Sequence, residues 1–361
     1  MQKLLPVLAG FAISVAPISG AAQAVASAED CAADLAAVDA IASQLLSNSA
    51  DIGWPGLMGM LPEGNRPVAE DGYCVIKDVR FPQMSGSQFA PQYTAGLVRW
   101  QAEWADPSRP MPPDRLTVDV QGAGMNMAAF GDPEDSSMQM FAYQSALLNK
   151  LYPMEFRLDM AFDREADRFE IRQFVAQNSY QSRIELSAAM RDIDLDGILQ
   201  ADMSTAPPLD KLAQIAIERA EITAISNGFF ERVAMSWLPA IYPRLGETPE
   251  TAVAAAQSVG RDQVSQLSDS MVPPDSKAAL IAMIDSLPHP IGTLRLVVDA
   301  PEGIMPSRIA ATQMLVKEPT LASYLGILGS ATVTAEWTPL EWPPQMLPPL
   351  FGEATFSPAA Q

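Results

Sequence analysis

The sequence predicts an α+β fold with a β-rich centre, in which one or more antiparallel meander sheets carry packed helices. Three observations lead to this expectation. Apolar residues alternate strictly along several segments, these segments follow one another through short polar turns, and helical patterns occur without the strand–helix–strand rhythm of parallel sheets. With 48% hydrophobic residues in a chain of 361, one large core or two smaller ones can be buried.

The first 24 residues have the features of a secretory signal peptide. Lys3 is the only charged residue in this segment, and the run at 4–18 is almost entirely apolar. Small residues then offer cleavage sites, of which we favour the one just before Val25. An uncleaved N-terminal anchor is the alternative, but the run falls short of the ~20 apolar residues that span a bilayer and contains Pro17. We therefore expect the protein to be exported to the periplasm.

We expect residues 25–337 to form a single exported α+β domain and residues 338–361 to form a proline-rich extended tail. A weak similarity between the strand pairs before and after Leu151 leaves open a division into two similar sheet halves near that residue. No later segment is long and apolar enough to cross a membrane. The mature chain is thus predicted to have no transmembrane segment.

The mature chain is expected to begin with a helix over 31–48, followed by an apolar loop at 52–62 that glycine and proline keep out of the helix. The apolar residues of the helix recur at spacings of three and four; they are Leu35, Val38, Ile41, Ala42, Leu45 and Leu46. The two cysteines, Cys31 and Cys74, are predicted to form one disulfide in an oxidising compartment. Two buried free thiols are the alternative.

Alternating apolar positions then predict a series of strands. They lie at about 73–81, 98–104, 116–120, 154–163, 169–171, 184–190 and 213–226. The clearest is 154–163, where every second residue is apolar and the residues between are mostly charged. At Ile193 and Leu195 the apolar parity switches, so we expect a β-bulge near Arg191 and Asp192 in a continuing strand.

The C-terminal third is predicted to alternate helices with strands. Asn227 is expected to cap a helix that reaches Ile241, and Thr248 before Pro249 to open a helix of about twenty residues. Asp275 is expected to cap a further helix that Pro288 ends. The remaining expected elements are a strand at 294–298, a broken helix at 306–325 and a last strand at 331–337.

The charge balance argues against nucleic acid as a partner. The chain has 23 basic and 43 acidic residues, a formal net charge of −20. Such a charge repels phosphate backbones and anionic lipid surfaces. We interpret the acidity as a solvated surface that favours solubility.

Asp192–Gly197 is the segment most similar to a metal-binding motif, because its acidic residues and its glycine match the first half of a calcium loop. The twelfth position, which should supply a bidentate glutamate, is Met203, and the nearest acid, Asp202, comes one residue early. Ile193 and Leu195 also suit a strand whose aspartates are solvated. We therefore predict no metal site here and keep a calcium module as an alternative.

Nineteen methionines include three Met-x-Met pairs, which suggest either Cu(I) binding or, more in keeping with methionine as an adaptable core residue, an apolar-ligand site. The pairs are Met58 with Met60, Met125 with Met127, and Met138 with Met140. The single histidine, His289, lies between two prolines and is interpreted as a turn residue. Gly122 and Gly124 lack the third glycine and the helix of a dinucleotide site. No catalytic residue and no cofactor are predicted.

Three segments carry a resemblance to uncharacterised exported proteobacterial families, distantly similar to AsmA-type envelope proteins. They are MEFRLDMAFDREADRFEIRQF from Met154, AEITAISNGFFERVAM from Ala220 and GTLRLVVDAP from Gly292. The resemblance lies in rhythm rather than in particular residues. It implies an envelope location and a β-rich, non-enzymatic role, although this chain is much shorter than AsmA-type proteins and lacks their retained anchor.

Three functional hypotheses follow. The first is a non-enzymatic periplasmic envelope protein that binds lipid or another apolar ligand, or assists envelope assembly through a protein partner; the methionine-rich apolar faces motivate it. The second is an envelope hydrolase that uses paired carboxylates, for which 43 acidic residues provide many candidates. The third is a calcium- or copper-binding module.

Overall fold

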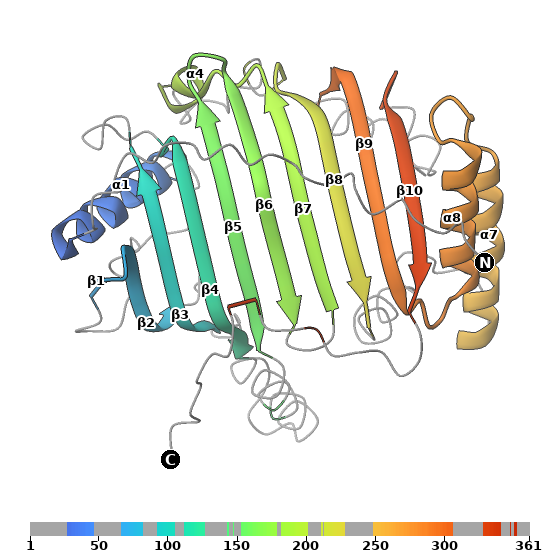
Figure 1. Ribbon diagram of the computed structural model, residues 1–361, viewed down its shortest axis with the longest axis horizontal. Coiled ribbons are helices and arrows are strands. Elements are labelled where there is room, and N and C mark those ends of the chain that lie inside the picture. The colour runs from blue at the N-terminus through green and yellow to red at the C-terminus, as the bar shows by residue number, and fades with distance from the viewer. Residues whose placement is uncertain are drawn as a thin grey trace, which may run out of the picture.

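The computed structural model describes residues 27–46, 66–81, 92–104, 112–126, 153–178, 182–200, 213–227, 248–305 and 328–340, together with positions 143, 147, 211, 347, 350 and 351. In these residues the chain forms one ten-stranded sheet, in which each strand pairs with the strands before and after it in the sequence (Figure 1). All the pairs are antiparallel. The predicted α+β class and β-rich centre are confirmed.

The strands are β1 (Val68–Glu70), β2 (Tyr73–Phe81), β3 (Gln92–Glu103), β4 (Arg115–Asn126), β5 (Met154–Asp163), β6 (Arg168–Asn178), β7 (Ser182–Arg191), β8 (Ala216–Ser226), β9 (Gly292–Ile304) and β10 (Thr332–Pro339). The helices are α1 (Ala28–Leu46), α4 (Leu195–Gln200), α7 (Pro249–Ser265) and α8 (Pro274–Asp285). β5 has the bounds predicted from its alternation. β3, β4 and β9 extend beyond their predicted limits, because ladder pairing continues where the apolar alternation ends.

The register gives the sheet one apolar and one mostly polar face. One row of directly paired residues crosses nine strands and is apolar throughout: Cys74, Trp100, Val118, Leu158, Phe174, Leu186, Ile222, Leu296 and Ala335. The next row points to the opposite face and is mostly polar: Val75, Arg99, Asp119, Arg157, Val175, Glu185, Thr223, Arg295 and Glu336. Since neighbouring residues of a strand point to opposite faces, the alternation in sequence becomes two chemically distinct surfaces.

Both edges of the sheet are protected against pairing with another strand. β1 is only three residues long. At the other edge α7 and α8 stand beside β10 (Figure 1), and the β10 edge is bonded to their segment: the N–H of Val333 donates to the carbonyl of Met271, 2.7 Å away, and that of Ala335 to Ser276 Oγ, 3.0 Å away. An unpaired edge would be a template for aggregation, so these contacts favour a sheet that ends here.

Two sequence predictions at element ends are wrong. No strand continues through Arg191 and Asp192: β7 stops at Arg191, Asp192 has a φ of 60°, and helix α4 begins at Leu195. Ile193 is buried, and its N–H donates to the carbonyl of Asp167 in the turn between β5 and β6, so the two turns are linked. An aspartate tolerates the left-handed conformation, which turns the chain out of the sheet. The parity change therefore marks the end of a strand.

The second correction concerns the helix caps. Thr248 caps α7 as predicted, through a reciprocal pair of bonds with Thr251, an arrangement that stabilises a helix start by ~1 kcal/mol. Asp275 is not the cap of α8. Pro273 holds that position without a side-chain bond, and Asp275 lies in the first turn, where a negative charge favours the helix dipole. α8 ends at Asp285, three residues before Pro288.

Several predictions fall outside the described residues. They concern the signal segment 1–24, the loop 52–62, the helix expected after Asn227 and the broken helix at 306–325. Within the described part of the chain, no helix combines the length and hydropathy needed to span a bilayer.

Candidate functional site

Helix α1 begins with a local hydrogen-bonded cap and is attached to β2 of the sheet by the disulfide. Ser27 and Asp30 exchange hydrogen bonds, the N–H of Ser27 donating to Asp30 Oδ2 at 2.9 Å and the N–H of Asp30 to Ser27 Oγ at 3.1 Å. The Ser27 N–H and the Ser27 hydroxyl, which also donates to Asp30 Oδ2 at 2.8 Å, lower the pKa of the Asp30 carboxyl because they favour its charged form. Beyond this cap, positions 31, 34, 35 and 38 recur at helical spacing on the side that faces the sheet.

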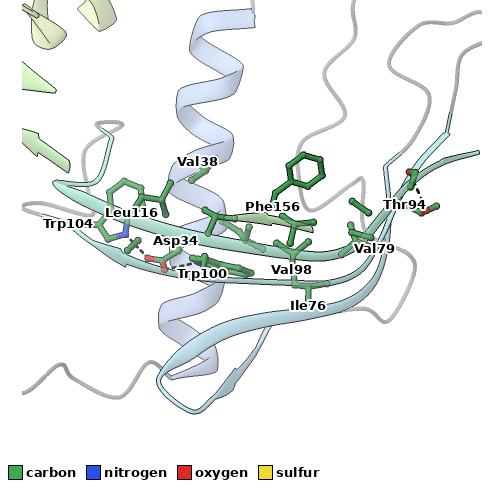
Figure 2. A pocket seen from close by; sticks show the side chains of 17 residues that line it. Asp34, Val38, Ile76, Val79, Thr94, Val98, Trp100, Trp104, Leu116 and Phe156 are labelled. Atoms are coloured by element: carbon green, nitrogen blue, oxygen red, sulfur yellow. Dashed lines mark hydrogen bonds between the residues drawn. The ribbon is translucent and has the colours of Figure 1, made fainter. Parts of the chain in front are cut away.

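A cavity of about 470 Å³ lies between α1 and the apolar face at β2–β5. Figure 2 shows α1 running across the strands that form the other side of the cavity. The side chains that line it are almost all aliphatic or aromatic: Asp34, Leu35, Val38, Ile76, Val79, Thr94, Ala95, Val98, Trp100, Ala102, Trp104, Leu116, Val118, Val120, Ala123, Gly124 and Phe156. Its volume is within the ~300–1,000 Å³ typical of small-molecule sites.

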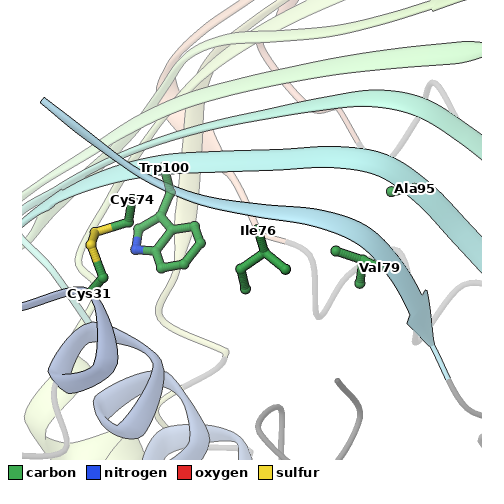
Figure 3. Packing of buried hydrophobic residues seen from close by; sticks show 6 residues of the cluster. All are labelled: Cys31, Cys74, Ile76, Val79, Ala95 and Trp100. Carbon is green, nitrogen blue, oxygen red and sulfur yellow. A yellow bond between two sulfur atoms is a disulfide. The ribbon is translucent and has the colours of Figure 1, made fainter. Parts of the chain in front are cut away.

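The floor of this cavity is a buried cluster around the disulfide (Figure 3). Its members are Cys31, Cys74, Ile76, Val79, Ala95 and Trp100. The predicted Cys31–Cys74 bond is confirmed, with the two Cα atoms 5.4 Å apart. By linking α1 to β2 across 43 residues, the disulfide fixes one wall of the cavity relative to the sheet.

Asp34 is the charged residue of the cavity lining. Its Oδ1 accepts the indole N–H of Trp104 at 2.6 Å, and its Oδ2 accepts that of Trp100 at 3.1 Å, as Figure 2 shows. The disulfide sulfur of Cys74 is 3.9 Å from Oδ2. Burial raises the pKa of the Asp34 carboxyl, the two indole bonds oppose that rise, and the nearby charge of Asp30 adds to it.

The opposite face of the sheet carries a buried ionic cluster. Asp119 on β4 has no exposed surface and lies between two arginines. Arg99 of β3 donates to Asp119 Oδ2 through Nε at 2.9 Å, and Arg157 of β5 donates to Oδ1 through Nε at 2.8 Å. The bond to Asp119 raises the pKa of the Arg157 guanidinium. Successive residues of β4 thus face opposite sides of the sheet: Val118 and Val120 line the apolar cavity, and Asp119 between them belongs to the charged cluster.

Two residues of the C-terminal segment lie on this charged cluster. The ring of Phe351 is 4.9 Å from the Arg157 guanidinium carbon and 5.6 Å from that of Arg99, distances at which cations attract aromatic faces. The N–H of Leu350 donates to the buried carboxylate of Glu155 at 3.0 Å. These residues of the predicted tail therefore pack against β3–β5.

A second cavity, of about 430 Å³, lies beside this cluster on the polar face. Its lining is polar or charged: Tyr73, Gln101, Glu103, Arg115, Thr117, Arg157, Asp159 and Gln173. Arg115 and Asp159 pair within it at 3.3 Å. The sheet thus separates an apolar cavity from a polar one.

In the calcium-like segment Asp192–Gly197, where no metal site is predicted, the described side chains of Asp192 and Asp194 bind different partners. Asp194 Oδ1 accepts the N–H of Gly197 at 2.8 Å, and Oδ2 accepts Lys211 Nζ at 2.6 Å, which together lower the pKa of Asp194. Asp192 pairs instead with Arg191 at 2.7 Å. Among the described residues, no group of three or more histidine, cysteine, aspartate or glutamate side chains could hold a metal ion.

The other sequence candidates are dispersed. His289 is an exposed turn residue whose N–H donates to the carbonyl of Ser286, in agreement with its interpretation. Gly122 has a φ of 65° where the β4–β5 register shifts, and the carbonyl of Gly124, which lines the apolar cavity, accepts the Thr94 hydroxyl. The side chains of the Met-x-Met pairs lie outside the described residues.

Sequence reasoning missed the residues that shape the apolar cavity. Trp100, Ala102 and Trp104 were expected only as one face of a strand, and Asp34 was not singled out. The signal was present: Asp34 falls beside Leu35 and Val38 in the apolar stripe of the first helix, and a carboxylate there has to find hydrogen-bond donors.

Comparison with known proteins returned no match, either to protein-family models or to curated sequences. The function is therefore argued from the geometry of this chain.

Proposed function

We propose that this is an exported, non-enzymatic envelope protein that binds the apolar chain of an amphiphile in the cavity between α1 and β2–β5. The observation that carries the proposal is the cavity itself, which has about 470 Å³ of space and an aliphatic and aromatic wall. Binding sites of this kind combine apolar walls with a few placed polar groups, here Asp34 and Thr94.

The location is part of the proposal. A signal peptide ending before Val25 would deliver the chain to an oxidising compartment, and the Cys31–Cys74 bond is compatible with one. Because that bond fixes α1, which is one wall of the cavity, formation of the disulfide should be required for ligand binding. At this cavity the hydrolase hypothesis gains no support, since Asp34 is the one carboxylate among the described residues that line it.

The experiment is a chain-length series of alkan-1-ols, whose uncharged head group leaves chain burial as the variable, titrated into the mature oxidised protein by calorimetry and by tryptophan fluorescence. Trp100 and Trp104 lie in the cavity wall, so occupation should change their emission. Each buried methylene contributes ~0.8 kcal/mol, so two more methylenes should tighten Kd roughly tenfold until the cavity is filled. A Kd independent of chain length would contradict chain burial.

Ala102→Phe is the variant that should block binding, because it adds a ring to the cavity lining at β3. Ala220→Phe is its matched control. Ala102 and Ala220 belong to the same row of paired residues on the apolar face, which passes through Leu116 on β4 and Met160 on β5 and reaches Ala220 on β8. Ala220 does not line the cavity. Ala123→Phe provides a second block from β4. Equal binding by the blocked and control proteins, with native circular dichroism, would refute the assignment of the chain to this cavity.

A further inference from the structure

Asp34 has unusual surroundings for a carboxylate. The other described residues that line its cavity are all uncharged. Its described partners, the indole N–H groups of Trp100 and Trp104, carry no charge. A desolvated carboxylate without a cation is costly, and the raised pKa of Asp34 reports this cost.

Anchoring α1 to β3 does not require a charge at this position. An amide oxygen would accept indole N–H groups without the desolvation cost of an ionised group. A carboxylate accepts about four hydrogen bonds, and the two indoles occupy one on each oxygen. Each oxygen therefore keeps capacity for a further donor, while the two indoles hold the carboxylate in a fixed orientation.

We infer that Asp34 receives a primary ammonium head group of the bound amphiphile, with the chain running along the cavity from Asp34 toward Thr94. This inference rests on the proposed function. Figure 2 shows Asp34 with Trp104 at one end of the lining and Thr94 at the other, with Val98 and Phe156 between them. An ammonium carries the donors and the charge that the carboxylate lacks. The net charge of −20 also favours a cationic ligand over an anionic one.

The test compares three ligands with the same chain, decylammonium, decan-1-ol and decanoate, each kept below its micelle concentration. The wild-type protein should bind decylammonium most tightly. Asp34→Asn should weaken decylammonium on the order of 10- to 100-fold, the effect of a charged hydrogen bond, and leave decan-1-ol unchanged. Glu29→Gln, which removes one exposed carboxylate from the same helix, should leave all three affinities unchanged and so controls for net charge.

The outcomes separate the two proposals. Binding of decan-1-ol without any preference for decylammonium, or an Asp34→Asn variant that weakens all three ligands alike, would overturn head-group recognition and leave the chain-binding function intact. Failure of every ligand to bind would overturn both. Should Asp34→Asn not fold, Trp104→Phe keeps the carboxylate and removes one orienting donor, and it should selectively weaken decylammonium. Lysophosphatidylethanolamine then shows whether the ammonium belongs to a lipid or to a simple amine. If it binds and Asp34→Asn abolishes the binding, the ligand is a lipid with an ammonium head group. If it does not bind while decylammonium binds tightly, the ligand is a simple amine.

Discussion

Replacing Asp119 by asparagine tests the view that a buried charge cluster holds the polar face together. The carboxylate has no exposed surface and is bonded by both flanking arginines, with contacts of 2.8–3.2 Å. Asparagine has nearly the same shape but removes the charge and turns an NH₂ group toward a guanidinium. Arg99 and Arg157 would then face each other with no carboxylate between them.

The expected loss is about 3 kcal/mol of unfolding free energy. Removing one partner of a fully buried ion pair costs 3–5 kcal/mol. Arg99 and Arg157 keep 31% and 33% of their side-chain surface exposed, so water partly solvates them after the change and the lower end of that range applies. The same substitution should loosen Phe351, whose ring lies over both guanidinium groups.

Urea denaturation followed by circular dichroism measures this loss. Glu70→Gln is the matched control, because it removes one carboxylate from an exposed pair, that with Lys77 at 2.8 Å. An exposed pair contributes about 0–1 kcal/mol. If Asp119→Asn lowers the unfolding free energy no more than Glu70→Gln does, burial does not determine how much the charge cluster stabilises the protein, and the expected loss of about 3 kcal/mol is wrong.

Two further predictions concern the cavity wall. Replacing Cys31 and Cys74 together by serine should lower the unfolding free energy by about 4 kcal/mol, because the disulfide no longer restricts the unfolded chain across a separation of 43 residues. The variant should also lose chain binding. Identical urea midpoints for the disulfide-bonded protein and the variant would contradict the expected loss of stability. Asp34 has a native pKa raised above 3.8, so the native state holds its proton more tightly and stability falls as pH rises from about 3.8 through the raised value. Asp34→Asn should remove that loss, so its stability relative to wild type should rise across this window and level off above it. Urea curves at several pH values decide, and a pH-independent offset would refute the assignment.

The strands could be predicted from the sequence because apolar and polar residues alternate along them. At Met154–Asp163 apolar residues alternate with charged ones except at Ala161, and the predicted bounds are those of β5. The start of α7 could also be predicted from the sequence, since Thr248 is a preferred cap residue and Pro249 is favoured at the first helical position. Such features depend on neighbours within four residues, so the chain alone specifies them.

Local pattern failed where two backbone conformations suit the same residues. Past Arg191 the change of apolar parity fits either a bulged strand or a turn into a helix, and the φ of Asp192 selects the turn. Asp275 is a good cap by type, but Pro273 and Pro274 already set the helix start two residues earlier. In both cases the surrounding structure decides between conformations of similar local energy.

The amino-acid sequence by itself determined the two faces of the sheet, the disulfide partners and the helix that contains Cys31. Apolar alternation and helical spacing act between near neighbours, and two cysteines allow only one pairing. The tertiary structure alone decided which residues meet. Asp34 and Trp104 are 70 positions apart, and their contact depends on how α1 crosses the sheet and on the register between β2 and β3. Register slips of one residue reverse a strand's faces, so the cavity exists only once long-range pairing is complete.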